Sequence, residues 1–306
     1  MSGQLVLKSQ NAVSDISDLP DIQYYIARVE ADGGVINNRS ELLEAFAFFY
    51  SSGVGSDKVV SATNPSWGIK KTEAGVVTKL YSLFGVIGDI VFATSGTIKP
   101  LYDTTNNFPS VYFGGSVSCY GKLSGVFNVQ SSVAIVTVNA VPTGVPYGES
   151  VTMPIGIIWS EKNYVADGAS STADYITVSR AIFRSAPTNT DPSTWWNSVA
   201  QSALTIGNFS VAPNVKAKPI AAHLSVTSGL DIVTENGAVA NRAASANNTR
   251  RLSDLTFLLG VSVSASGAAS GAAVSHFFEN WVVRDITIAQ TQIFTKRVST
   301  KYYNKV

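Results

Sequence analysis

Residues 79–115 read KLYSLFGVIGDIVFATSGTIKPLYDTTNNFPSVYFGG, and this stretch decides the fold. Short apolar runs alternate in it with clusters of Gly, Asn, Pro and Ser, and the same pattern continues over most of the chain after about residue 54. Such spacing is typical of a sandwich of short strands, whereas a parallel sheet would alternate its strands with helical segments. The sequence therefore predicts a mainly β protein.

The stretch 79–115 resembles the opening of concanavalin A-like, laminin G-like domains. Three pieces carry the resemblance, in the expected order and spacing: 80–85 (LYSLFG), 99–102 (KPLY) and 108–114 (FPSVYFG). The segment 284–290 (RDITIAQ), followed by a helix that ends in Lys301-Tyr302, is similar to the end of such domains. The resemblance covers roughly 60–306 and implies a concanavalin A-like jelly-roll β sandwich. Members of this family bind sugars, cleave them or only build structure, so the fold does not fix the function.

Individual strands follow from the pattern of apolar residues. The run 133–141 (VAIVTVNAV) predicts a strand buried on both faces. The run 255–264 predicts a strand with one apolar face, and 281–289 a strand at the rim of a sheet. Other strands are expected at 109–114, 151–159, 174–183 and 220–226. Three segments are expected to be loops, the first with a helical turn: 185–202, 240–252 and 264–273.

Two short helices are expected in 21–53. In the first, apolar residues fall at i, i+3, i+4 and i+7 after the N-cap candidate Asp21, and in the second they follow Ser40. Because such a helix pair is not stable alone, we expect it to pack on something, and we interpret it as an attachment element. The residues predicted to serve assembly are Ile22, Tyr25, Ile26, Val29, Phe46 and Phe49.

The remaining segments complete the predicted organisation. Residues 1–20 are expected to form an arm that docks on another subunit, and 54–306 to form the sandwich. Ile293, Phe294, Val298 and Tyr302 form a narrow apolar stripe, with Lys296, Arg297 and Lys301 around it, which predicts a short closing helix.

Composition excludes several classes of partner. Charged residues are 14% of the chain and the net charge is +1, with no basic stripe, so nucleic acid is not an expected partner. No secretory signal and no apolar run of about 20 residues is present. We therefore expect that the chain is made in the cytoplasm without secretion and does not insert into a membrane. Cys119 is the single cysteine and is expected to be a small buried apolar residue.

The sequence offers no recognisable catalytic constellation, and we expect no enzymatic activity. Glycoside hydrolysis needs two carboxyl groups about 5–10 Å apart. Along one strand, Glu279 and Asp285 would be separated by about 20 Å, and Asp231 and Glu235 by about 13 Å. Both separations are too large for such a pair, although carboxylates from different strands could still meet in space. His223 and His276 stand alone in apolar contexts and are expected to be structural. No metal-ligand spacing, G-x-S-x-G motif or phosphate loop occurs, so no metal and no cofactor are expected.

Two kinds of ligand contact are nonetheless possible from residue types. Trp195, Trp196 and Asn197, together with Tyr164, could stack on and hydrogen-bond to a sugar, although we favour the interpretation that the tryptophan pair anchors a loop at the edge of the sandwich. Asp103 and Asp167 could donate oxygen ligands to calcium, but single loop carboxylates are more often turn formers.

The segment 24–34 (YYIARVEADGG) resembles a short helical element near the N-termini of phage virion proteins that carry such sandwiches. The two resemblances together imply a structural virion subunit of a bacteriophage: a head fibre, capsid decoration or tail fibre component. Its expected location is the virion, and its expected partners are copies of itself and other virion proteins. One alternative is a carbohydrate-binding, receptor-recognition domain that binds a host-surface glycan, and a further alternative is a polysaccharide depolymerase.

Overall fold

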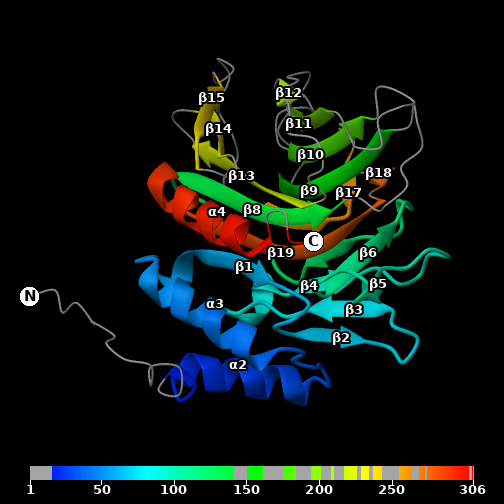
Figure 1. Ribbon diagram of the computed structural model, residues 1–306, viewed down its shortest axis with the longest axis vertical. Coiled ribbons are helices and arrows are strands. Elements are labelled where there is room, and N and C mark those ends of the chain that lie inside the picture. The colour runs from blue at the N-terminus through cyan, green and yellow to red at the C-terminus, as the bar shows by residue number, and fades with distance from the viewer. Residues whose placement is uncertain are drawn as a thin grey trace, which may run out of the picture.

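The computed structural model describes residues 16–140, 150–160, 175–183, 194–200, 208–209, 217–225, 229–233, 237–242, 255–263, 269–272, 274–302 and 305. Within these residues, two large antiparallel sheets stack face to face, and helices cover the outer face of one of them (Figure 1). The predicted fold class is confirmed: the protein is mainly β, a two-sheet sandwich with N-terminal helices and a C-terminal helix. This is the arrangement that the concanavalin A-like resemblance implies.

We call the helix-covered sheet the inner sheet, because it lies between the helices and the other sheet. Its described strands run in the order β15-β14-β13-β8-β19-β6-β5, and β1 pairs with β19 beside this path. The bounds are β1 (Val59–Thr63), β5 (Leu101–Asp103), β6 (Ser110–Gly114), β8 (Ser132–Ala140), β13 (Ala217–Ser225), β14 (Gly229–Val233), β15 (Val239–Arg242) and β19 (Val274–Arg284).

The second sheet, here the outer sheet, has the described order β12-β11-β10-β9-β16-β7-β4-β3-β2. Its strands are β2 (Ile69–Lys71), β3 (Val77–Leu80), β4 (Ile90–Phe92), β7 (Gly121–Leu123), β9 (Ser150–Ser160), β10 (Tyr175–Phe183), β11 (Thr194–Ala200), β12 (Asn208–Phe209) and β16 (Leu255–Leu259). A separate ribbon pairs β17 (Val261–Val263) with β18 (Ala269–Ala272), and two short 3-10 helices are η1 (Ser56–Lys58) and η2 (Val86–Gly88).

Strand β8 shows why the inner sheet is the centre of the molecule. Val133 and Ile135 belong to the core between the two sheets, whereas the alternating Ala134, Val136 and Val138 belong to the core between this sheet and the helices. All nine residues of the strand are buried, which confirms the prediction of a strand buried on both faces. The lone Cys119 is also buried in the inter-sheet core, as predicted.

The helical layer consists of α2 (Pro20–Ala31), α3 (Arg39–Ser51) and α4 (Ile288–Tyr302). Asn38 is the N-cap of α3: its side chain accepts a hydrogen bond from the Glu41 N–H and donates one to the Glu41 carboxylate. α4 packs on β13 and β8. α2 and α3 meet through Tyr25 and Phe46, whose ring centroids are 5.9 Å apart.

The structure places all six predicted assembly residues in the core between the helices and the inner sheet. Ile22, Tyr25, Ile26, Val29, Phe46 and Phe49 are each at most 6% exposed. Their contacts include Trp281 of β19, which lies parallel to Phe49. In this fold these side chains therefore stabilise the chain itself, and a partner of the helix pair would meet the opposite, exposed faces of α2 and α3.

Several local predictions were wrong. The strand predicted at 281–289 ends at Arg284, because Asp285 adopts a positive φ of 53° and α4 starts at Ile288. The strand predicted at 255–264 is interrupted at Gly260, whose φ is 90°. Three predicted loops contain strand residues: 185–202 contains β11, 240–252 contains the end of β15, and 264–273 contains β18. In each loop, Ser, Ala, Asn and Thr residues suggested turns, but pairing with a neighbouring strand overrode that local preference.

Candidate functional site

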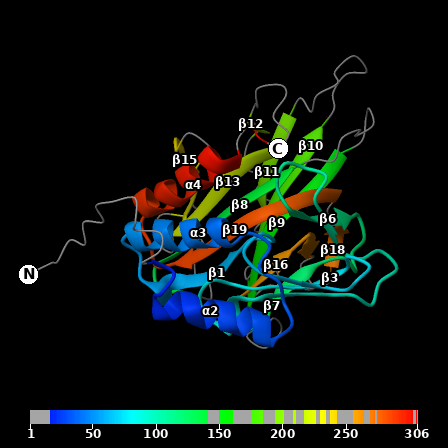
Figure 2. The same ribbon diagram turned by 60° about the horizontal axis from the view of Figure 1, so that its bottom comes forward.

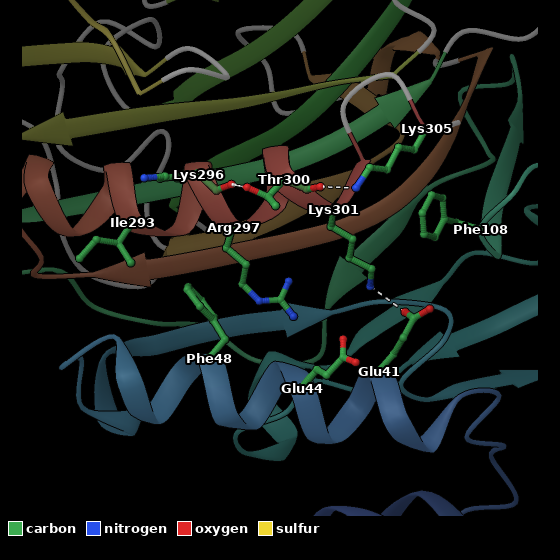
Figure 3. Close-up of a pocket in the computed structure, with 10 residues that line it drawn as sticks. All are labelled: Glu41, Glu44, Phe48, Phe108, Ile293, Lys296, Arg297, Thr300, Lys301 and Lys305. Atoms are coloured by element: carbon green, nitrogen blue, oxygen red, sulfur yellow. Dashed lines mark hydrogen bonds and ion pairs between the residues drawn. The ribbon is translucent and has the colours of Figure 1, made fainter. Parts of the chain in front are cut away.

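A groove runs between α3 and α4, which lie side by side over the inner sheet (Figure 2). Its volume is about 740 Å³. Figure 3 shows the side chains that line it, with α3 and α4 as opposite walls. The α3–α4 groove is defined by Glu41, Glu44, Phe48, Phe108, Ile293, Lys296, Arg297, Thr300, Lys301 and Lys305.

Helical spacing explains why these residues face the groove. On α3, Glu41, Glu44 and Phe48 follow one another at i, i+3 and i+7, so they share one face. On α4, Ile293, Arg297 and Lys301 do so at i, i+4 and i+8, with Lys296 and Thr300 beside them. The buried faces of both helices carry the apolar stripes, and polar walls are therefore left to line the groove.

Beneath the groove lies Glu279 of β19, a carboxylate with no exposed surface. Its oxygens accept hydrogen bonds from the Trp281 indole Nε1 at 2.8 Å, the Tyr302 hydroxyl at 2.8 Å and the Asn64 amide at 3.0 Å. Two cations of α4 complete its surroundings. The Arg297 guanidinium is 3.3 Å from Oε1, and the Lys301 ammonium is 3.5 Å from Oε2.

These contacts decide the charge of Glu279. Burial alone would raise its pKa, but the charges of Arg297 and Lys301 and the hydrogen bonds from Trp281 and Tyr302 outweigh burial, so the pKa lies below its ordinary value. Burial and the neighbouring carboxylate raise the pKa of Tyr302 well above its ordinary value. Glu279 is therefore an ionised residue, sealed from solvent, that holds α4 on the sheet, and it is unsuited to transfer protons to a ligand.

The groove walls carry an excess of positive charge. Lys301 is paired with Glu41 at 2.6 Å, and Arg297 is offset by Glu279. Lys296 and Lys305 then remain against the single carboxylate of Glu44, and all three side chains belong to exposed residues. The arrangement is suited to binding an anion.

A second buried ion cluster fixes α2. Asp89 has no exposed surface, and both of its oxygens accept hydrogen bonds from the Arg28 guanidinium, at 2.7 and 2.8 Å. Lys79 approaches the same carboxylate to 3.0 Å, and the Ser82 N–H donates to it at 2.8 Å. Asp89, which follows η2 directly, is thus neutralised, and it ties α2 to the start of β4.

The predicted calcium ligands are not brought together in the described part of the chain. Asp103 accepts hydrogen bonds from the backbone and hydroxyl of Thr105, as a turn former does, and it lies 3.2 Å from His276 Nδ1. Asp167 lies outside the described residues. Within those residues, no group of three or more His, Cys, Asp or Glu side chains could hold a metal ion. Burial lowers the pKa of His276, although the charge of Asp103 opposes this shift.

The predicted sugar-binding residues lie away from the groove or outside the description. Trp195, Trp196 and Asn197 form part of β11 in the outer sheet, paired with Ile182, Ala181 and Arg180 of β10. Tyr164 lies outside the described residues. Sequence reasoning considered Glu279 only as one member of a catalytic carboxylate pair and missed the ion network around it. A carboxylate inside an apolar strand is a usable signal, because such a charge must be neutralised by partners.

Neither a protein-family model nor a curated protein sequence matches the chain. Similar solved structures include a GH54 α-L-arabinofuranosidase soaked with a cyclic sulfate inhibitor, with a TM-score of 0.45 and 10% identity over 74% of this chain and 51% of that chain. Trypanosoma rangeli sialidase in complex with sialic acid has a TM-score of 0.44 and 9% identity, over 84% of this chain and 38% of that chain. The botulinum neurotoxin serotype G binding domain has a TM-score of 0.40 and 10% identity, over 79% of this chain and 51% of that chain.

The chain thus spans about half the length of the arabinofuranosidase and of the neurotoxin binding domain. At identities near one tenth and these TM-scores, the similarities carry no argument about function.

Proposed function

We propose that the chain is a non-enzymatic structural subunit of a bacteriophage particle, a head fibre, decoration or tail fibre component that displays the sandwich. The observation that carries the proposal is that the two buried carboxylates are held in ion networks that fix helices. Glu279 and Asp89 are each neutralised by two cations, and each fixes a helix to the rest of the chain. Removing one partner of such a buried pair is strongly destabilising, so these acids keep the helices in place, and because they are buried they cannot contact a partner themselves.

An exposed apolar face on the helix pair supports an attachment role. Tyr24 is 61% exposed, Tyr50 is 40% exposed and Leu19, just before α2, is 37% exposed. The Tyr50 hydroxyl donates a hydrogen bond to Asp21, which lies one turn before Tyr24, so Tyr24 and Tyr50 lie on the same side of the helix pair. Exposed aromatic residues of this kind are enriched at protein interfaces. The partners we propose are copies of this chain and other virion proteins, in the virion.

Further support comes from the chain's low content of charge and from the resemblance of 24–34 to an element of phage virion proteins. Within the described residues, no helix has both the length and the apolar character that crossing a bilayer would need.

Two measurements test this proposal. Light scattering after size-exclusion chromatography should give an oligomer, and Tyr24→Ser with Tyr50→Ser should reduce it to a monomer without loss of folded signal in circular dichroism. Antibodies against the purified chain should label assembled particles in electron microscopy. A monomeric wild-type chain, together with particles that carry no label, would refute the structural role.

A second candidate function, recognition of a host-surface carbohydrate, is favoured by the α3–α4 groove. The predicted contacts Trp195, Trp196, Asn197 and Tyr164 remain a prediction for the same function, to be tested on a glycan array with Trp195→Ala and Trp196→Ala variants. Incubation with capsule or cell-wall glycans, followed by a reducing-end assay, separates binding from depolymerase activity. We expect no new reducing ends, and their appearance would replace the binding role with an enzymatic one.

A further inference from the structure

We propose that the α3–α4 groove binds a carboxylated saccharide, with its acid groups at the α4 wall. This inference deepens the second candidate function by naming its site and ligand class, and it does not depend on the virion role. Neither attachment to a particle nor display of the sandwich requires a cationic groove on the helical layer.

The donors of the α4 wall favour carboxylates. Lys296 and Arg297 are neighbours on this wall, and Thr300 lies one turn further along α4. The Thr300 hydroxyl donates to the Lys296 backbone carbonyl at 2.8 Å, and the Lys305 ammonium donates to the Thr300 backbone carbonyl at 2.8 Å, so Lys305 folds back onto the last turn of α4. Ammonium and guanidinium groups form stronger hydrogen bonds with carboxylates than with neutral groups. Because Lys301 and Arg297 are already offset by Glu41 and Glu279, the charge available to a ligand comes mainly from Lys296 and Lys305.

The rest of the groove favours a sugar as the carrier of those carboxylates. Phe48 and Phe108 are half-buried rings that line it. The Arg297 guanidinium lies over the Phe48 ring, with its central carbon 4.9 Å from the centroid of that ring. Phe108 lies edge-on to Tyr302, with the two ring centroids 4.9 Å apart. One face of Phe48 is thus covered by Arg297, and the parts of the two rings that stay exposed offer apolar surface to the C–H groups of a sugar.

A peptide fits the groove less well. Both walls are helices whose backbone groups are bonded internally, so an extended peptide could not add as a strand. A helical peptide would need a row of apolar sites, whereas the groove offers only Phe48, Phe108 and Ile293 between charged residues. Its volume of about 740 Å³ falls within the range of small-ligand sites. The geometry therefore points to a short acidic oligosaccharide.

Isothermal titration calorimetry with trigalacturonate, and with maltotriose as the neutral control of equal length, tests the proposal. The wild-type chain should bind trigalacturonate with a Kd of about 1 mM or tighter and maltotriose at least about tenfold more weakly. The double variant Lys296→Gln, Lys305→Gln should weaken trigalacturonate binding about tenfold or more, because two charged donors are lost. Lys99→Gln, at an exposed lysine outside the groove, is the matched control and should change the Kd less than about twofold.

A gain-of-affinity variant guards against misfolding as the cause of lost binding. Glu44→Gln removes the carboxylate that opposes Lys296 and Lys305, so it should tighten trigalacturonate binding about twofold to threefold and leave maltotriose unchanged. The proposal is overturned if wild type gives no heat with trigalacturonate at about 10 mM, if maltotriose binds equally well, or if the lysine double variant keeps wild-type affinity. Weaker binding by the Glu44 variant would also contradict it. None of these results bears on oligomeric state or particle labelling, so the virion proposal stands or falls separately.

Discussion

Replacing Glu279 by Gln should destabilise the protein markedly, although the two side chains have nearly the same shape. The carboxylate is completely buried, and it is the common partner of Arg297, Lys301, Trp281 and Tyr302. The amide would keep one acceptor oxygen, but it would remove the negative charge and point an N–H₂ group at existing donors. Arg297 would lose its counter-charge, whereas Lys301 would keep Glu41.

The size of the effect follows from the exposure of the partners. Breaking a fully buried pair costs about 3–5 kcal/mol of unfolding free energy. Here the Arg297 and Lys301 side chains keep 14% and 16% of their surface in water, which compensates for part of the loss. We therefore expect a loss of about 3 kcal/mol, near the lower end of that range. With an unfolding entropy of about 2.1 cal/mol/K per residue, this corresponds to a fall in Tm of about 5 °C for a chain of 306 residues.

Differential scanning calorimetry at two pH values tests both the size and the cause. The folded-state pKa of Glu279 lies below its unfolded value, so its contribution is fully present above about pH 4.3 and is lost as the pH falls through the folded-state pKa. The gap in Tm between wild type and Glu279→Gln should therefore be largest at neutral pH and shrink in acid. Glu44→Gln, the same substitution at an exposed groove residue, should leave Tm unchanged. An equal Tm at neutral pH, or a gap that does not shrink in acid, would refute the ion-network reasoning.

Three further substitutions test how the helical layer and the turn before α4 are held. Asp89→Asn leaves Arg28 without its buried counter-charge and should cost about 3 kcal/mol in urea unfolding, and a loss below about 1 kcal/mol would contradict the anchor role of Asp89. Gly68→Ala places a Cβ 2.3 Å from the Tyr25 hydroxyl, so it should lower Tm by roughly 2–5 °C through strain, and an unchanged Tm would show that Tyr25 can move away freely. Asp285→Ala removes the carboxylate that accepts hydrogen bonds from the N–H groups of 130–132 and places alanine at a φ of 53°. We expect it to lower the free energy of unfolding by about 2 kcal/mol, and Asp285→Asn to lower it less, because asparagine tolerates this backbone conformation. Equal losses for the two variants would count against this view.

The sandwich could be predicted because its strands carry their own signals. In the run 133–141 both sets of alternating positions are mainly apolar, which indicates a strand covered on both faces, and β8 has that environment. The helices were equally readable, since their stripes at Ile22, Tyr25, Ile26 and Val29 match the buried residues of α2.

What covers the helices could not be predicted from periodicity. An apolar stripe shows that one face is buried, but it does not tell whether the cover is the same chain or a partner. The six assembly candidates therefore seemed available for attachment, whereas the structure packs them on Trp281, Trp67 and their neighbours. The groove was hidden for a similar reason, because Glu44 and Lys296 are more than 250 positions apart in the sequence and only the packing of α3 beside α4 brings them into one site.

Hydrogen exchange measured by mass spectrometry tests most directly whether α2, α3 and α4 form one body with the sandwich. If they do, amides of these helices should open with the same free energy as those of β8 and β19, and Glu279→Gln should lower protection in all of them together. Helices that exchange orders of magnitude faster than the strands, with strand protection unaffected by the substitution, would mean that the helical layer is a loosely held appendage and that no preformed groove exists.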